Sequence, residues 1–193
     1  MHDLRYMIIG ITGTDGAGKG TVVEYLAAHG FVHYSARGLI TQEIEKRGLA
    51  VNRDNTRLVA NSLRAEFGPA VIAQKYIERA QKENISNCII ESVRSLGEAE
   101  AIKAAGGILL AVDANQAVRY GRNVARGTSL DKISFEKFCE QETVEMNDPD
   151  PSGMQKAKVM EMADYTIMND STVEELEIKV ENFLITIVTK KPD

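Results

Sequence analysis

The chain has 193 residues, of which 44% are hydrophobic and 26% are charged, and its formal net charge is −5. This length suits one domain with a full core, and the acidic balance argues against a broad nucleic-acid-binding surface. The absence of a long apolar run argues against a membrane span. Cys88 and Cys139 lie far apart and predict neither a disulfide framework nor a zinc site. We therefore expect a globular protein of the reducing cytosol.

The first predicted elements are a strand, a glycine-rich turn and a helix. The apolar run 6–12 predicts a buried strand, and Val22, Val23 and Leu26 share one face of the helix that follows. Glycines let backbone N–H groups approach a phosphate closely, and the helix N-terminus adds a partial positive charge there. Lys19 can reach the outer phosphates. Because the strand and the helix are independently visible, we favour an ATP site over an ordinary glycine-rich turn.

The predicted ATP-binding residues of this turn are Gly13, Asp15, Gly16, Ala17, Gly18, Lys19, Gly20 and Thr21. Gly20 stands where most phosphate loops carry the Ser or Thr that contacts magnesium, and a hydroxyl follows one place later at Thr21. We therefore expect Mg²⁺ to be held mostly by nucleotide phosphates, waters and nearby carboxylates, with Asp15 and Glu91 acting through water.

Four further apolar runs predict strands, at residues 31–35, 88–92, 108–113 and 165–168. Helical patterns separate these runs, which favours parallel strands joined by crossover connections. We therefore predict an α/β fold with three layers, α/β/α, around a five-stranded parallel sheet. The predicted helices cover residues 38–48, 54–67, 97–105 and 115–126, the segment after Gly68 and Pro69, and the segment after the capping box at 171–174.

Two segments between strands are longer than a crossover needs. Residues 36–85 hold about three helices, and residues 127–159 hold a Pro-Asp-Pro turn with polar helices around it. Ligands bind at the carboxyl ends of the strands in an open parallel sheet, where both segments emerge. We therefore predict one domain with an acceptor-binding insertion at 36–85 and a lid at 127–159. The core of this domain would comprise residues 1–35, 86–126 and 160–193.

The strand at 88–92 is followed by side chains that could carry chemistry. Glu91 would lie near the glycine-rich turn, because the central strands of such sheets are neighbours. It could hold a magnesium-bound water or accept a proton from the attacking group. Arg94 could bind a phosphate with its planar guanidinium. The alternative is a solvated strand end with a surface salt bridge.

Further arginines are candidates for phosphate contacts. Arg119, Arg122 and Arg126 are spaced by three and four residues, so they lie near one side of one helix. Like charges repel one another unless an anion neutralises them, and we predict that Arg122 and Arg126 contact ATP. The alternative is a solvated helix face. Asp113, at the end of the preceding strand, is expected to be structural.

The predicted acceptor-binding residues are Ser35, Arg37, Arg64 and Arg94. Ser35 and Arg37 follow the second strand, and Arg64 lies beside the core on a later helix. Each arginine could equally be a surface charge.

These motifs resemble those of P-loop nucleotide kinases. Residues 18–21 (GKGT) resemble the adenylate kinases, and residues 15–18 (DGAG) resemble the thymidylate kinases. Glu91 and Arg94 resemble the acidic residue and the arginine of the Asp-Gly-Phe-Pro-Arg segment of adenylate kinases. That resemblance implies that Arg94 binds the transferred phosphoryl group or its acceptor.

The resemblance extends to two further segments. Arg122 and Arg126 resemble the Glu-Arg-Leu-x-x-Arg stretch of adenylate kinases, which implies that the first contacts the adenine side and that the second begins the lid. Residues 33–38 resemble the His-x-Ser-Thr-Gly-Asp segment, in which Ser35 matches but Arg37 and Gly38 replace Gly and Asp. This departure implies a changed acceptor site.

The lid of adenylate kinases carries paired arginines that clamp phosphates during transfer. The only cations after Arg126 in the predicted lid are Lys132, Lys137, Lys156 and Lys158. The resemblance therefore implies either that a lysine substitutes for an arginine or that the lid plays a smaller part.

The last third of the chain is similar to other members of the same superfamily. Residues 163–176 are similar to the closing strand and helix of dephospho-coenzyme A kinases. The stretch from Glu91 onward resembles the kinase-like domains joined to some deoxycytidylate deaminases, through residues 91–94, 111–114, 119–120, 126–127, 131–132 and 162–164.

The resemblance implies a magnesium- and ATP-dependent kinase that acts on a nucleoside monophosphate, with deoxynucleotides among the candidates. Its catalytic residues would be Lys19, Glu91, Arg94 and Arg126. One alternative is a dephospho-coenzyme A kinase, in which Glu91 or Asp15 would matter more as a general base. Another is a nucleotide-binding regulatory module that no longer transfers phosphate. The sequence leaves the oligomeric state open.

Overall fold

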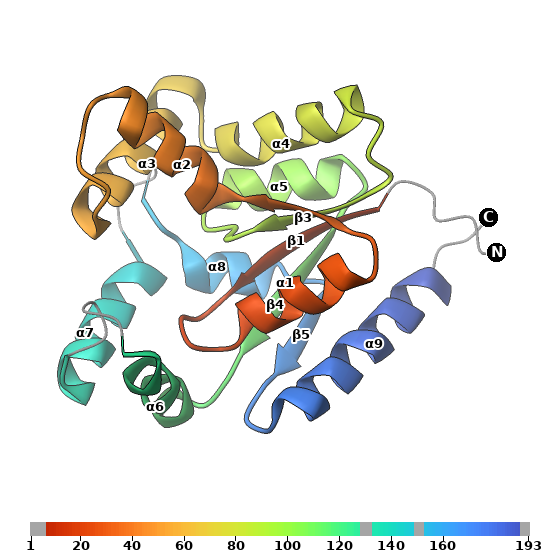
Figure 1. The fold of residues 1–193 in the computed structure, drawn as a ribbon. Coiled ribbons are helices and arrows are strands. Elements are labelled where there is room, and N and C mark those ends of the chain that lie inside the picture. The colour runs from red at the N-terminus through yellow and green to blue at the C-terminus, as the bar shows by residue number, and fades with distance from the viewer. Residues whose placement is uncertain (1–6, 128–132, 149–152, 190–193) are drawn as a thin grey trace.

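The computed structural model describes residues 7–127, 133–148 and 153–189. At its centre lies a parallel sheet of five strands in the order β2-β3-β1-β4-β5 (Figure 1). The strands are β1 (Met7–Gly13), β2 (Val32–Ser35), β3 (Asn87–Glu91), β4 (Ile108–Asp113) and β5 (Tyr165–Met168). This sheet confirms the predicted α/β fold class. Residue 6, where the first strand was predicted to begin, lies outside the described residues.

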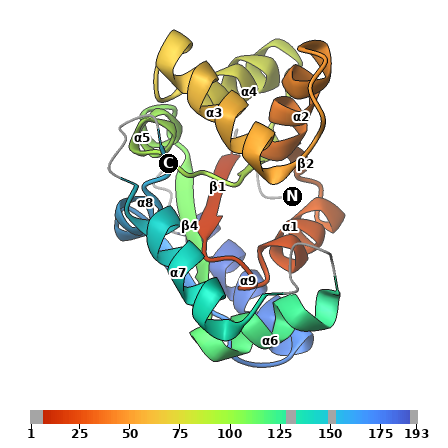
Figure 2. The ribbon, with the colours of Figure 1, turned by 90° about the vertical axis from the view of Figure 1, so that its left-hand side faces the viewer.

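Helices cover both faces of the sheet and its carboxyl end. In chain order they are α1 (Lys19–Ala28), α2 (Ala36–Lys46), α3 (Arg53–Phe67), α4 (Val71–Lys82), α5 (Leu96–Ala104), α6 (Gln116–Arg126), α7 (Phe135–Met146), α8 (Lys156–Glu161) and α9 (Val173–Thr189). Helices α2 to α5 and α8 pack on one face, and α1 and α9 pack on the other. Figure 2 shows α2 and α3 on one side of the loop between β1 and α1, and α6 and α7 on the other.

The core follows from the alternation of side chains along the central strands. Ile8 faces the layer of α2 to α5, whereas Ile9 and Ile11 face α1 and α9. All three are almost fully buried, as is expected of a parallel strand covered on both faces. Each such side chain contributes about 1.5–3 kcal/mol to folding.

The register of the sheet brings the ends of three strands together. Ile11 of β1 pairs with Glu91 of β3, and Gly13 pairs with Val112 of β4. The loop after β1 therefore emerges between the carboxyl ends of β3 and β4. Glu91, at the end of β3, lies beside the end of β1 that leads into the glycine-rich turn, as expected.

A buried ion pair joins α3 to α5. Nε and Nη2 of Arg64 donate hydrogen bonds to Oε1 of Glu98 at 3.1 and 3.0 Å, and both side chains are at most 3% exposed. Oε2 of Glu98 accepts a hydrogen bond from the backbone N–H of Arg94 at 2.9 Å. This corrects the expectation that Arg64 binds the acceptor: its guanidinium is committed to Glu98, because the two helices bury both charges together. The pair instead holds the segment that carries Arg94.

No helix within the described ranges combines the length and the apolar character that crossing a bilayer requires.

We expect Arg64→Met to lower the free energy of unfolding by about 3–5 kcal/mol, because it leaves the Glu98 carboxylate buried without its counter-ion. Urea denaturation at neutral pH would measure the loss. Arg79→Met is the matched control, because Arg79 pairs with Glu83 at an exposed site and its loss should cost less than about 1 kcal/mol. A similarly small loss for Arg64→Met would contradict the structural role.

Candidate active site

The turn between β1 and α1 fits tightly among its neighbours. Gly13 has a φ of +128°, and a Cβ atom there would lie 1.9 Å from the carbonyl oxygen of Val112. Gly18 has a φ of +98°, and a Cβ atom there would lie 2.4 Å from Nδ2 of Asn169. That amide also donates a hydrogen bond to the carbonyl oxygen of Ala17 at 2.8 Å. Glycine is therefore required at both ends of the turn, since other residues would clash and adopt a strained backbone.

The first turn of α1 presents backbone N–H groups without intrahelical partners. The N–H of Val22 donates to the carbonyl oxygen of Gly18 at 3.2 Å. Among the backbone hydrogen bonds of the described residues, none uses the N–H of Lys19, Gly20 or Thr21. These groups and the helix dipole together form a site that favours an anion.

Lys19 lies over the turn. Its Nζ atom donates hydrogen bonds to the carbonyl oxygens of Gly13 at 3.1 Å and Thr14 at 2.5 Å, and lies 3.6 Å from Oδ1 of Asp15. Burial lowers the pKa of Lys19 to about 8, although the attraction of Asp15 opposes that shift. Lys19 is therefore a cation beside the anion site, and it loses its charge as the pH rises through about 8.

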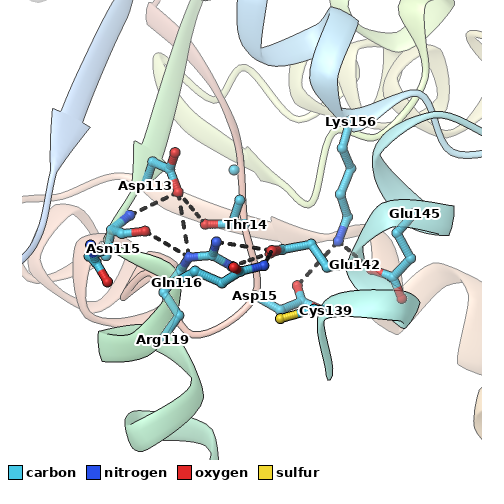
Figure 3. A network of polar contacts seen from close by, with 12 residues as sticks. Thr14, Asp15, Asp113, Asn115, Gln116, Arg119, Cys139, Glu142, Glu145 and Lys156 are labelled. Atoms are coloured by element: carbon cyan, nitrogen blue, oxygen red, sulfur yellow. Dashed lines mark hydrogen bonds and ion pairs between the residues drawn. The ribbon is translucent and has the colours of Figure 1, made fainter. Parts of the chain in front are cut away.

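A second lysine meets Asp15 from the other side. Nζ of Lys156, at the start of α8, lies 3.4 Å from Oδ1 of Asp15 and 2.5 Å from Oε2 of Glu145 on α7 (Figure 3). Burial alone would raise the pKa of Asp15. The attraction of Lys156, Lys19 and Arg94 outweighs it and holds the pKa of this carboxyl well below its usual range. Asp15 is therefore a partly exposed anion that two lysines and Arg94 attract.

Arg119 belongs to a separate network on the other side of the turn (Figure 3). It pairs with Glu142 of α7, and its Nε atom donates to the carbonyl oxygen of Ala114 at 2.8 Å. Asp113 accepts a hydrogen bond from Oγ1 of Thr14 at 2.6 Å. Glu142 thus neutralises Arg119. This corrects the expectation for Arg119 alone, whose charge is neutralised within the protein and needs no external anion.

The other two arginines of α6 lie further along the helix. Arg122 donates hydrogen bonds to the carbonyl oxygens of Asn169 at 2.8 Å and Ser171 at 3.0 Å. It thereby ties α6 to the loop after β5. Arg126 is exposed at the end of α6 and contacts the side chain of Asn123. Contacts of Arg122 and Arg126 with ATP remain predictions.

At the end of β3, Glu91 pairs with a histidine that the sequence analysis missed. Oε2 of Glu91 lies 2.9 Å from Nε2 of His33 on β2. The two are far apart in sequence, and only the pairing of β2 with β3 brings them together. An odd-even count along two neighbouring strands could have indicated that they share a face. Ser92, directly after Glu91, has a φ of +68°, which is strained for a residue other than glycine.

The remaining predicted acceptor residues lie at the ends of β2 and β3. Ser35 caps α2, because its Oγ atom accepts a hydrogen bond from the N–H of Gly38 at 3.3 Å. Arg37 is exposed one residue into that helix. Nη1 of Arg94 lies 3.2 Å from Sδ of Met154, and Arg94 is close enough to Asp15 and Lys19 to affect the pKa values of both. The structure thus gathers Arg94 with the turn and places Arg64 elsewhere.

The described residues contain no group of three or more His, Cys, Asp or Glu side chains that could hold a metal ion. Asp15 and Glu91, the two predicted to act through water, are each paired with a basic side chain. Lys132, one of the lysines predicted in the lid, lies outside the described residues.

The strand, the glycine turn and the five-stranded parallel sheet define a P-loop NTPase with a kinase-like fold. Residues 9–150 match the profile of a family described as an AAA domain. A UPF0200 protein from Thermococcus onnurineus is 32% identical over 190 residues, which cover 95% of this chain and 100% of that relative. This chain belongs to that AAA domain family and to the UPF0200 proteins.

Solved structures of other proteins share the fold. TT1252 from Thermus thermophilus has a TM-score of 0.65 at 20% identity, over 94% of this chain and 98% of that one. A shikimate kinase from Aquifex aeolicus has a TM-score of 0.57 at 13% identity, over 96% and 100% of the two chains. A dephospho-CoA kinase from Campylobacter jejuni has a TM-score of 0.56 at 16% identity, over 94% and 97%.

We expect Gly18→Ala to weaken nucleotide binding at least about tenfold, because the new methyl group displaces either the turn or Asn169. Isothermal titration calorimetry with ATP would measure the change. Gly121→Ala on α6 is the control, since a Cβ atom there has nothing within 4 Å, and it should bind ATP as the unchanged protein does. Equal affinities for all three proteins would contradict the assigned site.

ATP affinity should fall as pH rises through about 8. The pKa of Lys19 is lowered to about 8 in the folded protein, so the free protein loses this charge above that pH. Binding then requires proton uptake, and the affinity should drop about tenfold by one pH unit above the pKa. Titrations between pH 7 and 9 would show the drop. Lys19→Arg, whose guanidinium stays charged, should flatten the profile; a parallel drop in that variant would refute this assignment.

Proposed function

We propose that this protein is an ATP-dependent kinase that transfers a phosphoryl group to a small phosphorylated acceptor, with a nucleoside monophosphate as the first candidate. The observation that supports this most is the open first turn of α1. Its N–H groups lie beside Lys19, and the strand next to β1 ends in Glu91 and is followed by Arg94. Phosphoryl transfer needs positioning and charge neutralisation, and this site offers both.

Each residue has a role in the proposal. The turn at residues 13–21 holds the phosphates of ATP, and Lys19 neutralises the outer ones. Arg94 binds the transferred group or the acceptor phosphate. Arg122 contacts ATP on its adenine side. Arg126, at the start of the lid, is a catalytic residue that contacts the phosphates.

The segments on either side of the turn supply the acceptor site and the lid in this proposal. Residues 36–85 bind the acceptor, with Ser35 and Arg37 at their entrance. Residues 127–159 form the lid, whose described part includes Glu145 and Lys156. Both segments follow the carboxyl ends of strands, which is the position that binds ligands in such sheets.

We further propose that Mg²⁺ accompanies the nucleotide. Carboxylate and hydroxyl oxygens fit this cation, and Asp15, Thr21 and Glu91 offer them near the turn. Because Asp15 and Glu91 do not form a complete set of metal ligands, phosphates and waters would supply most of the ligands of Mg²⁺. The ion would offset the charge that develops on the phosphates.

A second candidate, a dephospho-coenzyme A kinase, is favoured by the contact between Glu91 and His33. A hydroxyl acceptor must lose a proton when it attacks, and a carboxylate held at 2.9 Å from an imidazole is placed to receive it. An acceptor phosphate needs no such base. The fold shared with a dephospho-CoA kinase agrees with this alternative.

A coupled assay for ADP across nucleoside monophosphates and dephospho-coenzyme A would test the proposal. One acceptor should support steady turnover, and Lys19→Ala should reduce kcat/KM by about 10²–10³, since it removes a charge aimed at the phosphates. Lys82→Ala, at the exposed end of α4, should change nothing. ATP binding without turnover on any acceptor would instead favour a regulatory module.

Glu91→Gln should separate the two acceptor classes. With a hydroxyl acceptor, it should lower kcat by about 10²–10⁴ because the proton acceptor is lost. With an acceptor phosphate, kcat should change by less than about tenfold. Steady-state kinetics on whichever acceptor the panel identifies would give the answer.

A further inference from the structure

We propose that Lys156 binds the outermost phosphoryl group of the nucleoside triphosphate, and that Asp15 occupies the place of that group until the nucleotide arrives. This inference rests on the proposed function and adds a catalytic residue to it. Of the lid lysines considered from the sequence, Lys137 pairs with Glu140 at an exposed site and Lys158 is exposed. Among the described lysines of this segment, Lys156 is the one that contacts the turn.

Lys156 is fixed by the core. It opens α8, which packs against β1 and α5, and the neighbouring Val159 is fully buried. The N–H of Gln155 donates a hydrogen bond to the carbonyl oxygen of Arg94 at 2.9 Å. The position of Nζ relative to the turn is therefore set by packed elements on both sides.

The two anions beside Lys156 differ in how they are held. Glu145 lies 2.5 Å from Nζ, and its side chain is 12% exposed. Asp15 lies 3.4 Å from Nζ, and its side chain is 43% exposed. Lys156 itself is 4% exposed. A buried ammonium needs an anion at all times. Glu145 can remain paired with Lys156 at all times, whereas the side chain of Asp15, which is more exposed, can rotate away from Lys156.

The oxygen of Asp15 stands where a phosphoryl oxygen would be neutralised. Oδ1 lies 3.6 Å from Nζ of Lys19 and 3.4 Å from Nζ of Lys156, and Arg94 also attracts this carboxylate. A terminal phosphoryl group bound to the first turn of α1 would bring more negative charge to the same cations. It would therefore displace Asp15 by repulsion and take both lysines as partners.

The experiment compares binding of a non-hydrolysable ATP analogue and of ADP by calorimetry, in excess EDTA so that Asp15 cannot act through a metal. Lys156→Met should weaken binding of the analogue about tenfold and that of ADP less than about threefold, since only the analogue carries the outermost group. Lys156→Arg should restore most of the difference. Lys158→Met, on the same helix, is the matched control and should leave both affinities unchanged.

Equal losses for the two nucleotides, or no loss, would overturn the inference while leaving the proposed function intact. Failure of the unchanged protein to bind either nucleotide would overturn both. If Lys156→Met does not fold, Asp15→Asn decides: removal of the competing anion should tighten binding of the analogue severalfold. Weaker or unchanged binding in Asp15→Asn would then refute the exchange of Asp15 for a phosphoryl group.

Discussion

The close fit of the glycine turn against β4 and the loop after β5 is the constraint on which the site depends. A side chain at Gly13 would meet the backbone of Val112, and one at Gly18 would meet Asn169. Because the turn has no room to shift, the N–H groups of α1 and the amino group of Lys19 have defined positions before any ligand is present. Such preorganisation is what charge neutralisation in phosphoryl transfer requires.

Three buried charges of the helical layers are balanced between helices rather than within them. Arg64 of α3 pairs with Glu98 of α5, Arg119 of α6 pairs with Glu142 of α7, and Lys156 of α8 pairs with Glu145. Burying such pairs costs desolvation energy that their attraction repays only in part. We infer that they matter mainly for alignment, because a small displacement of either helix would leave a buried charge unpaired.

The sequence predicted the sheet well because each strand is a short apolar run between helical patterns. The turn at 13–18 was recognisable because its glycines, strand and helix are contiguous. Partners brought together by the fold were not predictable in this way. Arg64 and Glu98 are 34 residues apart, His33 and Glu91 are 58 apart, and Asp15 and Lys156 are 141 apart. Local spacing predicts which charged residues share a helix face. It does not predict which opposite charge from a distant part of the chain will pack beside them.

The hydrogen bond between Gln155 and Arg94 has a mechanical consequence. It links Gln155, the residue just before Lys156, to the backbone of Arg94 in the segment after β3. Lys156 and Arg94 therefore approach the turn from one hydrogen-bonded unit, and a displacement of either residue would carry the other with it.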